Sequence, residues 1–150
     1  MFAHGLLYAA TGYHRPALLA IDPRQARGDV TGSHVRWSHD KGVSLTPSVI
    51  VVGDEIYFVS DAGVASCFDA RTGIPHWSER LGGGFSASPV YAAGRLFFPN
   101  EEGVVYVVKA AKSFELLATN DLEERSLASP VVDEGALLLR TEAHLWRIEE

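Results

Sequence analysis

Six histidines and one cysteine are the side chains of this 150-residue chain most able to bind a metal ion. No two histidines share a short metal-ligand spacing with a carboxylate or thiol partner. His34 and His39 fall on one expected strand region, and their odd spacing of five residues places them on opposite faces of a regular strand. We therefore predict no metal site and expect the histidines on the exposed rims of the fold. They are His4, His14, His34, His39, His76 and His144.

Two short segments resemble catalytic or nucleotide-binding signatures. Ser38-His39-Asp40 has the residue types of a hydrolase triad, but adjacent residues cannot converge their side chains on one proton path. The segment Gly82-Gly83-Gly84-Phe85-Ser86-Ala87 fits G-x-G-x-x-A, which binds dinucleotides only where a strand runs into a helix. Here an expected strand precedes the glycines and Ser88-Pro89-Val90 follows them. The first signature is rejected, and the second predicts a flexible loop.

Paired carboxylates occur at Glu101-Glu102 and Asp133-Glu134. Such pairs do acid/base work when a pocket forces their pKa values apart. Both pairs fall at expected turns, where solvated charge is the simpler interpretation. Glu123-Glu124-Arg125 is interpreted in the same way, as a polar loop. The sequence therefore predicts no catalytic residue.

Composition and charge restrict the classes of partner. Hydrophobic residues make up 47% of the chain, which is enough for a core. The net charge of -6, with scattered Lys and Arg, argues against binding of nucleic acid or anionic lipid. A single cysteine, Cys67, excludes an internal disulfide and a C-x-x-C pair, and we expect it in the core. No signal peptide and no apolar stretch of bilayer length is present, so we expect no membrane insertion and leave the compartment open.

A short proline-containing motif, called the proline phrase below, recurs along the chain. Thr46-Pro47-Ser48-Val49 returns as Ser88-Pro89-Val90 and again as Ser129-Pro130-Val131, so that the prolines lie 42 and then 41 residues apart. A turn glycine and an apolar run follow each phrase. The glycines are Gly53, Gly94 and Gly135. A period near forty residues indicates stacked supersecondary units.

Strand signals come in sets of four separated by turn residues, and almost no segment has a helical period. The clearest set has strands at 48–52, 55–60, 64–69 and 75–80. Its first two strands are apolar at nearly every position, which suits a sheet packed on both faces. Face-to-face packing of successive sheets is the architecture of a propeller. The pattern therefore predicts an all-β fold: a partial β-propeller of three to four four-stranded antiparallel blades.

We expect one domain, 1–150, with blades at about 1–40, 45–81, 86–120 and 127–150. The third blade has strands at 89–92, 95–99, 104–109 and 114–119. The first blade has strands at 6–10, 17–22 and 34–38, and its inner strand is nearly missing. The last blade lacks an outer strand. The first and last blades are therefore expected to be incomplete.

The segment from Cys67 to Trp77 resembles the tryptophan-docking repeat A-x-D-x-x-T-G-x-x-x-W of the PQQ-like β-propellers, with Cys67 in place of Ala. Thr72 and Gly73 are the T-G pair of the repeat. Asp69 can accept the hydrogen bonds that close the turn, and Gly73 permits a positive φ. Trp77 presents a large flat surface to a neighbouring blade. The motif therefore predicts contact between blades.

Two other blades depart from this repeat. In the first blade Asp22 precedes a longer loop, and Thr31 and Gly32 lead to Trp37 one residue late. The third blade has lost the motif, with Lys109-Ala110-Ala111-Lys112-Ser113 in place of Asp and Thr-Gly, and Leu116 or Leu117 near the tryptophan position. We expect that interface to be weaker or packed by aliphatic side chains.

The resemblance implies a fold more firmly than a function. The family includes quinoprotein dehydrogenases, the outer-membrane assembly lipoprotein BamB and many secreted bacterial proteins. The dehydrogenases bind a quinone and a calcium ion within a complete ring, and no position here matches those ligands, so we expect no PQQ and no other cofactor. The resemblance implies a non-catalytic binding or scaffolding module. The alternative is the C-terminal portion of a quinoprotein-type enzyme whose active centre lies in absent blades.

In a meander, the loops after the second and fourth strands emerge on the same side of the blade. Recognition residues concentrate on loops of this kind. We therefore expect a binding face for a protein or polar ligand made of Tyr13, His14, Arg15, Lys41, Phe85 and Arg125. The opposite face, with the stretched 23–32 loop that contains Arg24 and Arg27, is the second choice.

Incomplete blades leave open strand edges and sheet faces, which favour association. We expect the chain to be a fragment of a longer propeller or a half-ring that forms a homodimer. Its expected partners are thus remaining blades, a second copy or another protein. Members of the family are often exported, which implies a location for a longer parent and not for this chain.

Overall fold

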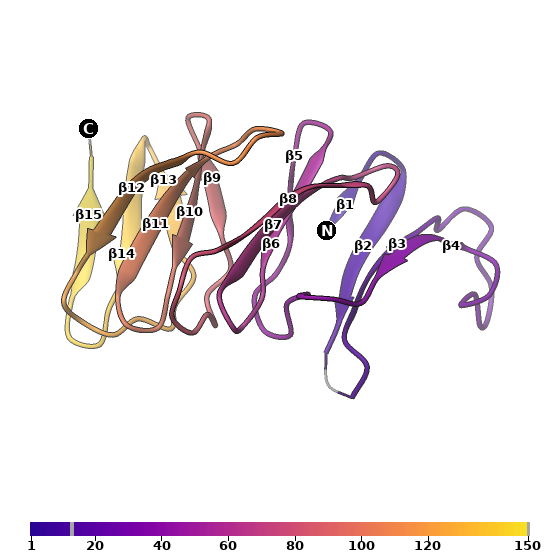
Figure 1. Cartoon of the computed structure of the whole chain (residues 1–150), viewed down its shortest axis with the longest axis horizontal. Helices are drawn as coiled ribbons and strands as arrows, with labels where there is room; N and C mark the ends of the chain where they lie inside the picture. The colour runs from indigo at the N-terminus through magenta and orange to yellow at the C-terminus, as the bar shows by residue number, and fades with distance from the viewer. Residues whose placement is uncertain (13, 150) are drawn as a thin grey trace.

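The computed structural model describes residues 1–12 and 14–149, and these residues form four antiparallel sheets. Figure 1 shows the sheets side by side, and each is a meander in chain order. The all-β prediction is confirmed, and we call the sheets blades 1 to 4. Blade 1 contains β1 (Phe2–Ala3), β2 (Leu6–Thr11), β3 (Ala17–Ile21) and β4 (Val35–His39). Blade 2 contains β5 (Ile50–Val52), β6 (Glu55–Val59), β7 (Val64–Asp69) and β8 (Pro75–Arg80).

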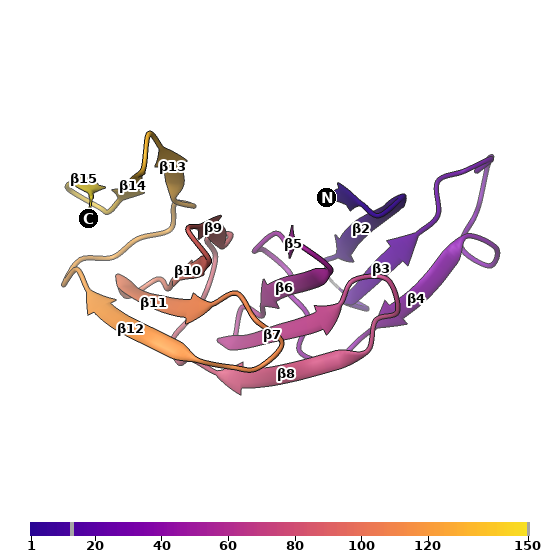
Figure 2. The same ribbon diagram turned by 90° about the horizontal axis from the view of Figure 1, so that it is seen from above.

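Blade 3 repeats this plan, and blade 4 has three strands among the described residues. Blade 3 contains β9 (Val90–Ala92), β10 (Arg95–Pro99), β11 (Val104–Lys109) and β12 (Leu116–Asp121). Blade 4 contains β13 (Val131–Asp133), β14 (Ala136–Arg140) and β15 (Leu145–Ile148). Seen from above in Figure 2, the blades follow an arc, with the first strands on its inner side and β4, β8 and β12 on its outer side.

The inner strand of blade 1 corrects one expectation. That strand was predicted to be nearly missing, but β1 pairs Phe2 with Leu7 and Ala3 with Leu6. It is two residues long, too short to give a sequence pattern. Blade 1 is therefore a four-stranded sheet like blades 2 and 3.

The core lies between blades because each sheet is apolar on both faces. Tyr8 and Leu18 of blade 1 pack against Phe58 and Phe68 of blade 2. On the other face of blade 2, Tyr57 and other residues pack against blade 3. The buried set between blades 3 and 4 is smaller, with Val105, Leu137 and Leu139. Burial of one such side chain contributes about 1.5–3 kcal/mol, so the stacking of blades is the main stabilising force.

The tryptophan-docking turn in blade 2 has the predicted geometry. One carboxylate oxygen of Asp69 accepts hydrogen bonds from the backbone N–H groups of Arg71 and Thr72, at 3.0 and 2.8 Å. The Thr72 hydroxyl donates to the same oxygen at 2.8 Å. These bonds lower the pKa of Asp69, against the opposing effect of burial, which is the largest single influence. Gly73 closes the turn with a φ of 73°.

Trp37 of blade 1 docks on this turn. Its indole N–H donates to the carbonyl oxygen of Ala70 at 2.9 Å. A Cβ on Gly73 would lie 2.6 Å from Cδ2 of Trp37, so only a glycine lets the ring lie this close. The glycine of one blade is thus the receptor for the tryptophan of the preceding blade.

Trp77 docks on blade 3 in a different way. Its indole N–H donates to the carbonyl oxygen of Ala111 at 3.0 Å, and its ring meets Phe114 edge-on with centroids 5.1 Å apart. An aromatic contact therefore replaces the glycine platform that blade 3 lacks. The register pairs Val107 with Ala118, whereas it pairs Cys67 with Trp77, so Ala118 takes the tryptophan position that was assigned to Leu116 or Leu117.

The stretched motif of blade 1 keeps its tryptophan and loses its turn. The buried Asp22 carboxylate accepts a two-point contact from Arg24, at 2.9 and 2.6 Å, and one contact from Arg36 at 2.6 Å. These arginines hold the pKa of Asp22 far below its usual range. Thr31 bonds through its backbone N–H to Asp29 and not to Asp22, and Gly32 has no neighbour that a Cβ would meet. Thr31 and Gly32 therefore take no part in a docking turn.

We predict that Gly73→Ala destabilises the protein more than Gly94→Ala does. Both glycines have positive φ, so both variants carry the cost of a left-handed residue, about 1–2 kcal/mol. Only Gly73→Ala also places a methyl group against Trp37, because nothing lies within 4 Å of a Cβ at Gly94. Urea denaturation of both variants measures the difference.

Subtraction of the free-energy loss of Gly94→Ala from that of Gly73→Ala removes the backbone contribution. The remainder is the cost of the contact between the new methyl group and Trp37. Equal losses of unfolding free energy in the two variants would mean that the tryptophan moves aside at no cost.

Candidate functional site

The loops that follow second and fourth strands gather on one side of the arc, at the bottom of Figure 1. This surface, called the loop face below, consists of the joining segments 40–49, 81–89 and 122–130 and the turns 14–16, 60–63, 100–103 and 141–144. It brings together residues from all four blades. The predicted grouping of these loops therefore matches the arrangement of the strands.

Backbone hydrogen bonds connect the turns to the joining segments. Phe85 N–H donates to the carbonyl oxygen of Asp61 at 3.0 Å, and Glu101 N–H donates to Gly84 at 2.8 Å. The same pattern recurs at blade 4, where Glu142 N–H donates to the Arg125 carbonyl oxygen at 2.9 Å. Such bonds hold the loops in one arrangement, so the face is a preorganised surface.

Carboxylates add a second set of contacts between turns and joining segments. Asp61 accepts from the backbone N–H of Leu45 at 2.7 Å, and Glu101 accepts from the hydroxyl of Ser86. The pair Glu101-Glu102 was interpreted as solvated turn charge, and for Glu101 this is corrected, because its side chain is bonded to the joining segment. Sequence reasoning missed this role because the two partners lie in different loops.

Glu124 makes the most connected of these contacts. It accepts hydrogen bonds from the hydroxyl of Thr141 at 2.7 Å and from the backbone N–H of Ala143. Its third partner is Nδ1 of His144, at 2.8 Å. The bonds from His144 and Thr141 hold the pKa of Glu124 below its usual value. The Thr141 hydroxyl also accepts from the Trp146 indole at 2.9 Å. Glu124 therefore ties the joining segment to blade 4.

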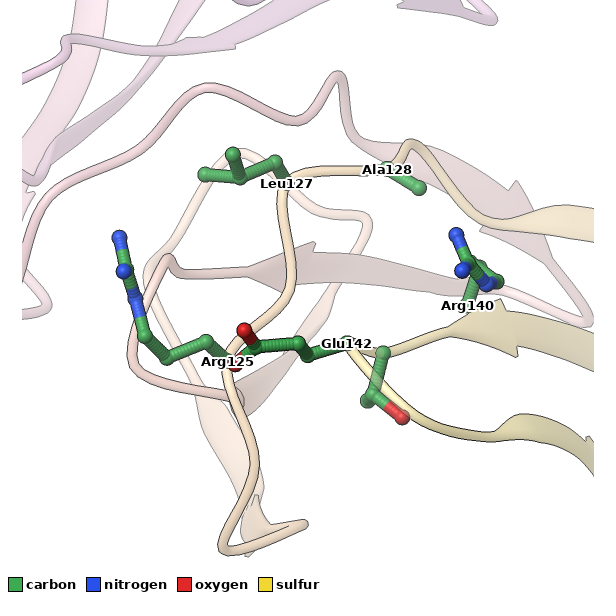
Figure 3. Close-up of a pocket in the computed structure, with 6 residues that line it drawn as sticks. Arg125, Leu127, Ala128, Arg140 and Glu142 are labelled. Carbon is green, nitrogen blue, oxygen red and sulfur yellow. The ribbon is translucent and has the colours of Figure 1, made fainter.

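An open pocket of about 510 Å³ lies where the joining segment 122–130 passes the end of β14. Figure 3 shows its lining, with Arg125 and Arg140 at opposite ends and Glu142 between them. Leu127 and Ala128 lie along one side. Leu127 is 60% exposed. The pocket thus combines two cations with an apolar wall.

Of the predicted contact residues, the pocket contains only Arg125. His14, Arg15 and Lys41 are exposed on the loop face at blades 1 and 2, and Tyr13 lies outside the described residues. Phe85 is a correction, because its side chain is 1% exposed in the core between blades 2 and 3. A loop position next to glycines resembles a surface position, but here the loop folds inward onto blade 3.

Arg140, Leu127 and Glu142 were not singled out from the sequence. One signal was available for Arg140, which is the last residue of a second strand. The same position in β6 and β10 holds Val59 and Pro99, and both are buried. A charged residue at a position that is apolar in the other repeats indicates that no apolar surface of a following blade covers this position in blade 4.

The histidines do not form a metal site in the described part of the chain, where no group of three or more His, Cys, Asp or Glu side chains could hold an ion. His14 and His144 are exposed as expected, whereas the other four are partly buried. The His39 ring packs edge-on against Phe68, with centroids 4.6 Å apart, and His4 bonds to the carbonyl oxygen of Gly53. These histidines contribute to packing between blades.

Three further expectations concern reactive or membrane-spanning groups. Cys67 is buried as expected, and burial raises the pKa of its thiol to about 12, which keeps it protonated at neutral pH. The glycine-rich segment 82–87 joins β8 to β9 with no helix after it. Residues 1–12 and 14–149 contain no helix of the length and apolarity needed to cross a bilayer.

The family model for the outer membrane protein assembly factor BamB matches residues 61–150. Among solved structures, BamB from Moraxella catarrhalis superposes with a TM-score of 0.74 over 99% of this chain, at 16% identity. The superposition covers 42% of that protein, so this chain spans about two fifths of its length. No curated protein sequence matches the chain.

Two other solved structures share the fold. The computationally designed Ika4 protein superposes with a TM-score of 0.71 at 11% identity, over 98% of this chain and 88% of that protein. A europium-containing methanol dehydrogenase superposes with a TM-score of 0.60 at 12% identity, over 78% of this chain and 23% of the enzyme. Similarity at this level of identity shows the fold alone.

We predict that Glu124→Gln lowers the melting temperature at neutral pH and has a smaller effect in acid. The folded-state pKa of Glu124 is lowered, so its carboxylate contributes stability above its ordinary pKa of 4.5, and this contribution is lost as the pH falls through the folded-state value. Thermal melts of both proteins between pH 7 and pH 3 measure the difference.

Glu123→Gln is the matched control, because it removes the neighbouring exposed carboxylate without touching the turn. A difference between the wild-type and Glu124→Gln melting temperatures that stays constant down to pH 3 would contradict a role for the ionised form.

Proposed function

Since this chain belongs to the family of the outer membrane protein assembly factor BamB, we propose that it is a non-catalytic scaffold that binds other proteins through its loop face. The observation that carries this proposal is the preorganised loop face with its open pocket. Rigid loops lose little conformational entropy on binding, which favours recognition.

The titratable groups support a non-catalytic role. Three of the carboxylates with lowered pKa values, Asp22, Asp69 and Glu124, each accept several hydrogen bonds from neighbouring turns or arginines. A catalytic acid or base needs a pKa near the working pH and access to a substrate. These carboxylates are instead ionised and occupied by structural partners. We propose that no cofactor, PQQ included, is needed for this function.

The alternative remains a portion of a quinoprotein-type enzyme with its active centre in further blades. The fold similarity to methanol dehydrogenase is compatible with it. Among residues 1–12 and 14–149, no group of three or more His, Cys, Asp or Glu side chains could hold the metal ion that this alternative requires. The scaffold is therefore the proposal with more support.

The end faces of the arc favour assembly with additional blades. Phe2 and Leu7 on the outward side of blade 1 are 64% and 41% exposed, and Leu145 of blade 4 is 72% exposed. We propose that further propeller blades or a second copy cover these faces. The similar extent of the Ika4 protein supports a unit of about this size.

The homodimer version makes a direct prediction. Light scattering after size-exclusion chromatography should give the mass of two chains, because the apolar ends of one copy would meet those of the other. Leu7→Glu and Leu145→Glu should each return the mass to that of one chain. Ile74→Glu, which changes an exposed side chain away from both end faces, should leave the dimer intact. A single-chain mass for the wild type would exclude this version.

The proposed binding face is tested by photo-crosslinking in cells that produce the protein. A photoreactive amino acid at Leu127 on the loop face should give one protein adduct of defined mass. The same group at Ile74, on the turn between β7 and β8, should give none, because that turn lies on the opposite side. Adducts of equal yield at both positions, or at neither, would contradict the proposal.

A further inference from the structure

We propose that the pocket beside β14 binds an acidic segment of the partner protein, with one carboxylate side chain of the segment bound by Arg125 and another by Arg140. The inference rests on the proposed scaffold function and adds the chemistry of the partner. Three observations support it: the unpaired guanidinium groups, the apolar wall of Leu127 and Ala128, and the position of Arg140 in the repeat.

The charges in the pocket are the first support. Several arginines of the described chain have partners: Arg24 and Arg36 bond to Asp22, Arg71 to Asp54, Arg80 to the Ala62 carbonyl oxygen and Arg147 to Glu149. The Arg125 and Arg140 side chains form no hydrogen bond or ion pair with any described residue. Two unpaired cations thus line one pocket of a chain whose net charge is -6.

The repeat position of Arg140 is the second support. Val59 and Pro99 occupy this position in blades 2 and 3, where the next blade buries them. Any partner that packs against blade 4 in the same way meets Arg140 instead. Removal of a guanidinium from water without a partner is costly, so a partner that covers it must supply hydrogen-bond acceptors, and a carboxylate supplies both the acceptors and the opposite charge.

A second copy of this chain does not meet that requirement. Leu7 and Ala9 of β2 hold the register positions of Ile56 and Phe58, the residues with which blade 2 packs against the preceding blade. Neither side chain carries a charge. A neighbouring copy that docked its blade 1 here in the same way would bring no carboxylate from these β2 positions to Arg140. This charge mismatch favours an acidic segment from another protein.

The shape of the pocket favours a peptide over a small anion. Its volume of about 510 Å³ is far larger than one carboxylate, and the two guanidinium groups lie at its opposite ends (Figure 3). Leu127 is 60% exposed and offers an apolar surface for a neighbouring side chain of the same segment. A peptide with alternating acidic and apolar residues can use both features at once.

The backbone on both sides of the pocket is already fixed. The Arg125 carbonyl oxygen accepts from Glu142 N–H at 2.9 Å, and the Arg140 carbonyl oxygen accepts from the Ser126 hydroxyl at 2.8 Å. Glu142 is the one carboxylate in the lining, and its charge opposes an acidic ligand. Removal of that charge should therefore strengthen binding.

Fluorescence anisotropy with two labelled hexapeptides tests the inference. One peptide alternates leucine and glutamate, and the other has glutamine at each glutamate. The wild-type chain should bind the acidic peptide and not its glutamine counterpart. Arg125→Gln and Arg140→Gln should each weaken binding about tenfold, as expected for the loss of one charged hydrogen bond. Glu142→Gln should strengthen it.

Arg27→Gln is the matched control, because it removes one exposed arginine of the same charge from the opposite side of the fold. An equal loss in this variant would show non-specific attraction and overturn the proposal. Equal binding of the glutamine peptide, or displacement of the acidic peptide by an equal concentration of inorganic phosphate, would overturn it too. So would a dimer that dissociates in Arg140→Gln, which would make a second copy the occupant.

The crosslinking experiment separates this inference from the function on which it rests. An adduct at Leu127 together with no discrimination between the peptides would reject the acidic ligand and keep the scaffold. The absence of a specific adduct would reject the scaffold itself. Thermal melts of the arginine variants should match the wild type, since neither side chain has an internal partner to lose.

Discussion

The rest of the structure depends on one constraint, the apolar character of both faces of each blade. A sheet of this kind is stable only when a neighbour covers each face, so the blades must stack. The docking of Trp37 on the Gly73 turn of the next blade adds direction to that stacking, because the indole N–H reaches one carbonyl oxygen, that of Ala70. Where blade 3 lacks the glycine, the edge-on contact of Trp77 with Phe114 maintains the spacing. The blades can therefore stack even where one of them lacks the tryptophan-docking motif.

Stacking also explains the loop face. Because each blade is a meander, the joining segments and the second turns emerge on one side, where hydrogen bonds between them form a continuous layer. Glu124 closes the layer at blade 4 through Thr141, Ala143 and His144. The loops are thus a structural part of the fold and a surface that can present side chains at fixed positions. The pocket beside β14 belongs to this layer, and its arginines stand where earlier blades have buried apolar residues.

Much of the fold could be predicted from local signals. Turn glycines, the proline phrase and the apolar runs located the strands of blades 2 and 3 to within a few residues, since each signal acts within one hairpin. The candidate site was harder to predict. Phe85 follows three glycines and resembled a surface residue, but the loop turns it into the core. Asp22 resembled the turn aspartate of blade 2, but Arg36, fourteen residues away, pairs with it instead. Both errors arose from contacts between segments that no local pattern records.

The sequence by itself determined the architecture, because a repeat of about forty residues with two-sided apolar strands has few ways to bury its surface. It also determined the docking turn, whose Asp69, Thr72 and Gly73 interact within five residues. Only the tertiary structure decided which side chains share the pocket. Arg125 and Arg140 come from a joining segment and a strand end, and their proximity depends on how blade 4 packs against blade 3. That packing is a sum of many contacts between blades, so it appears in no single stretch of the chain.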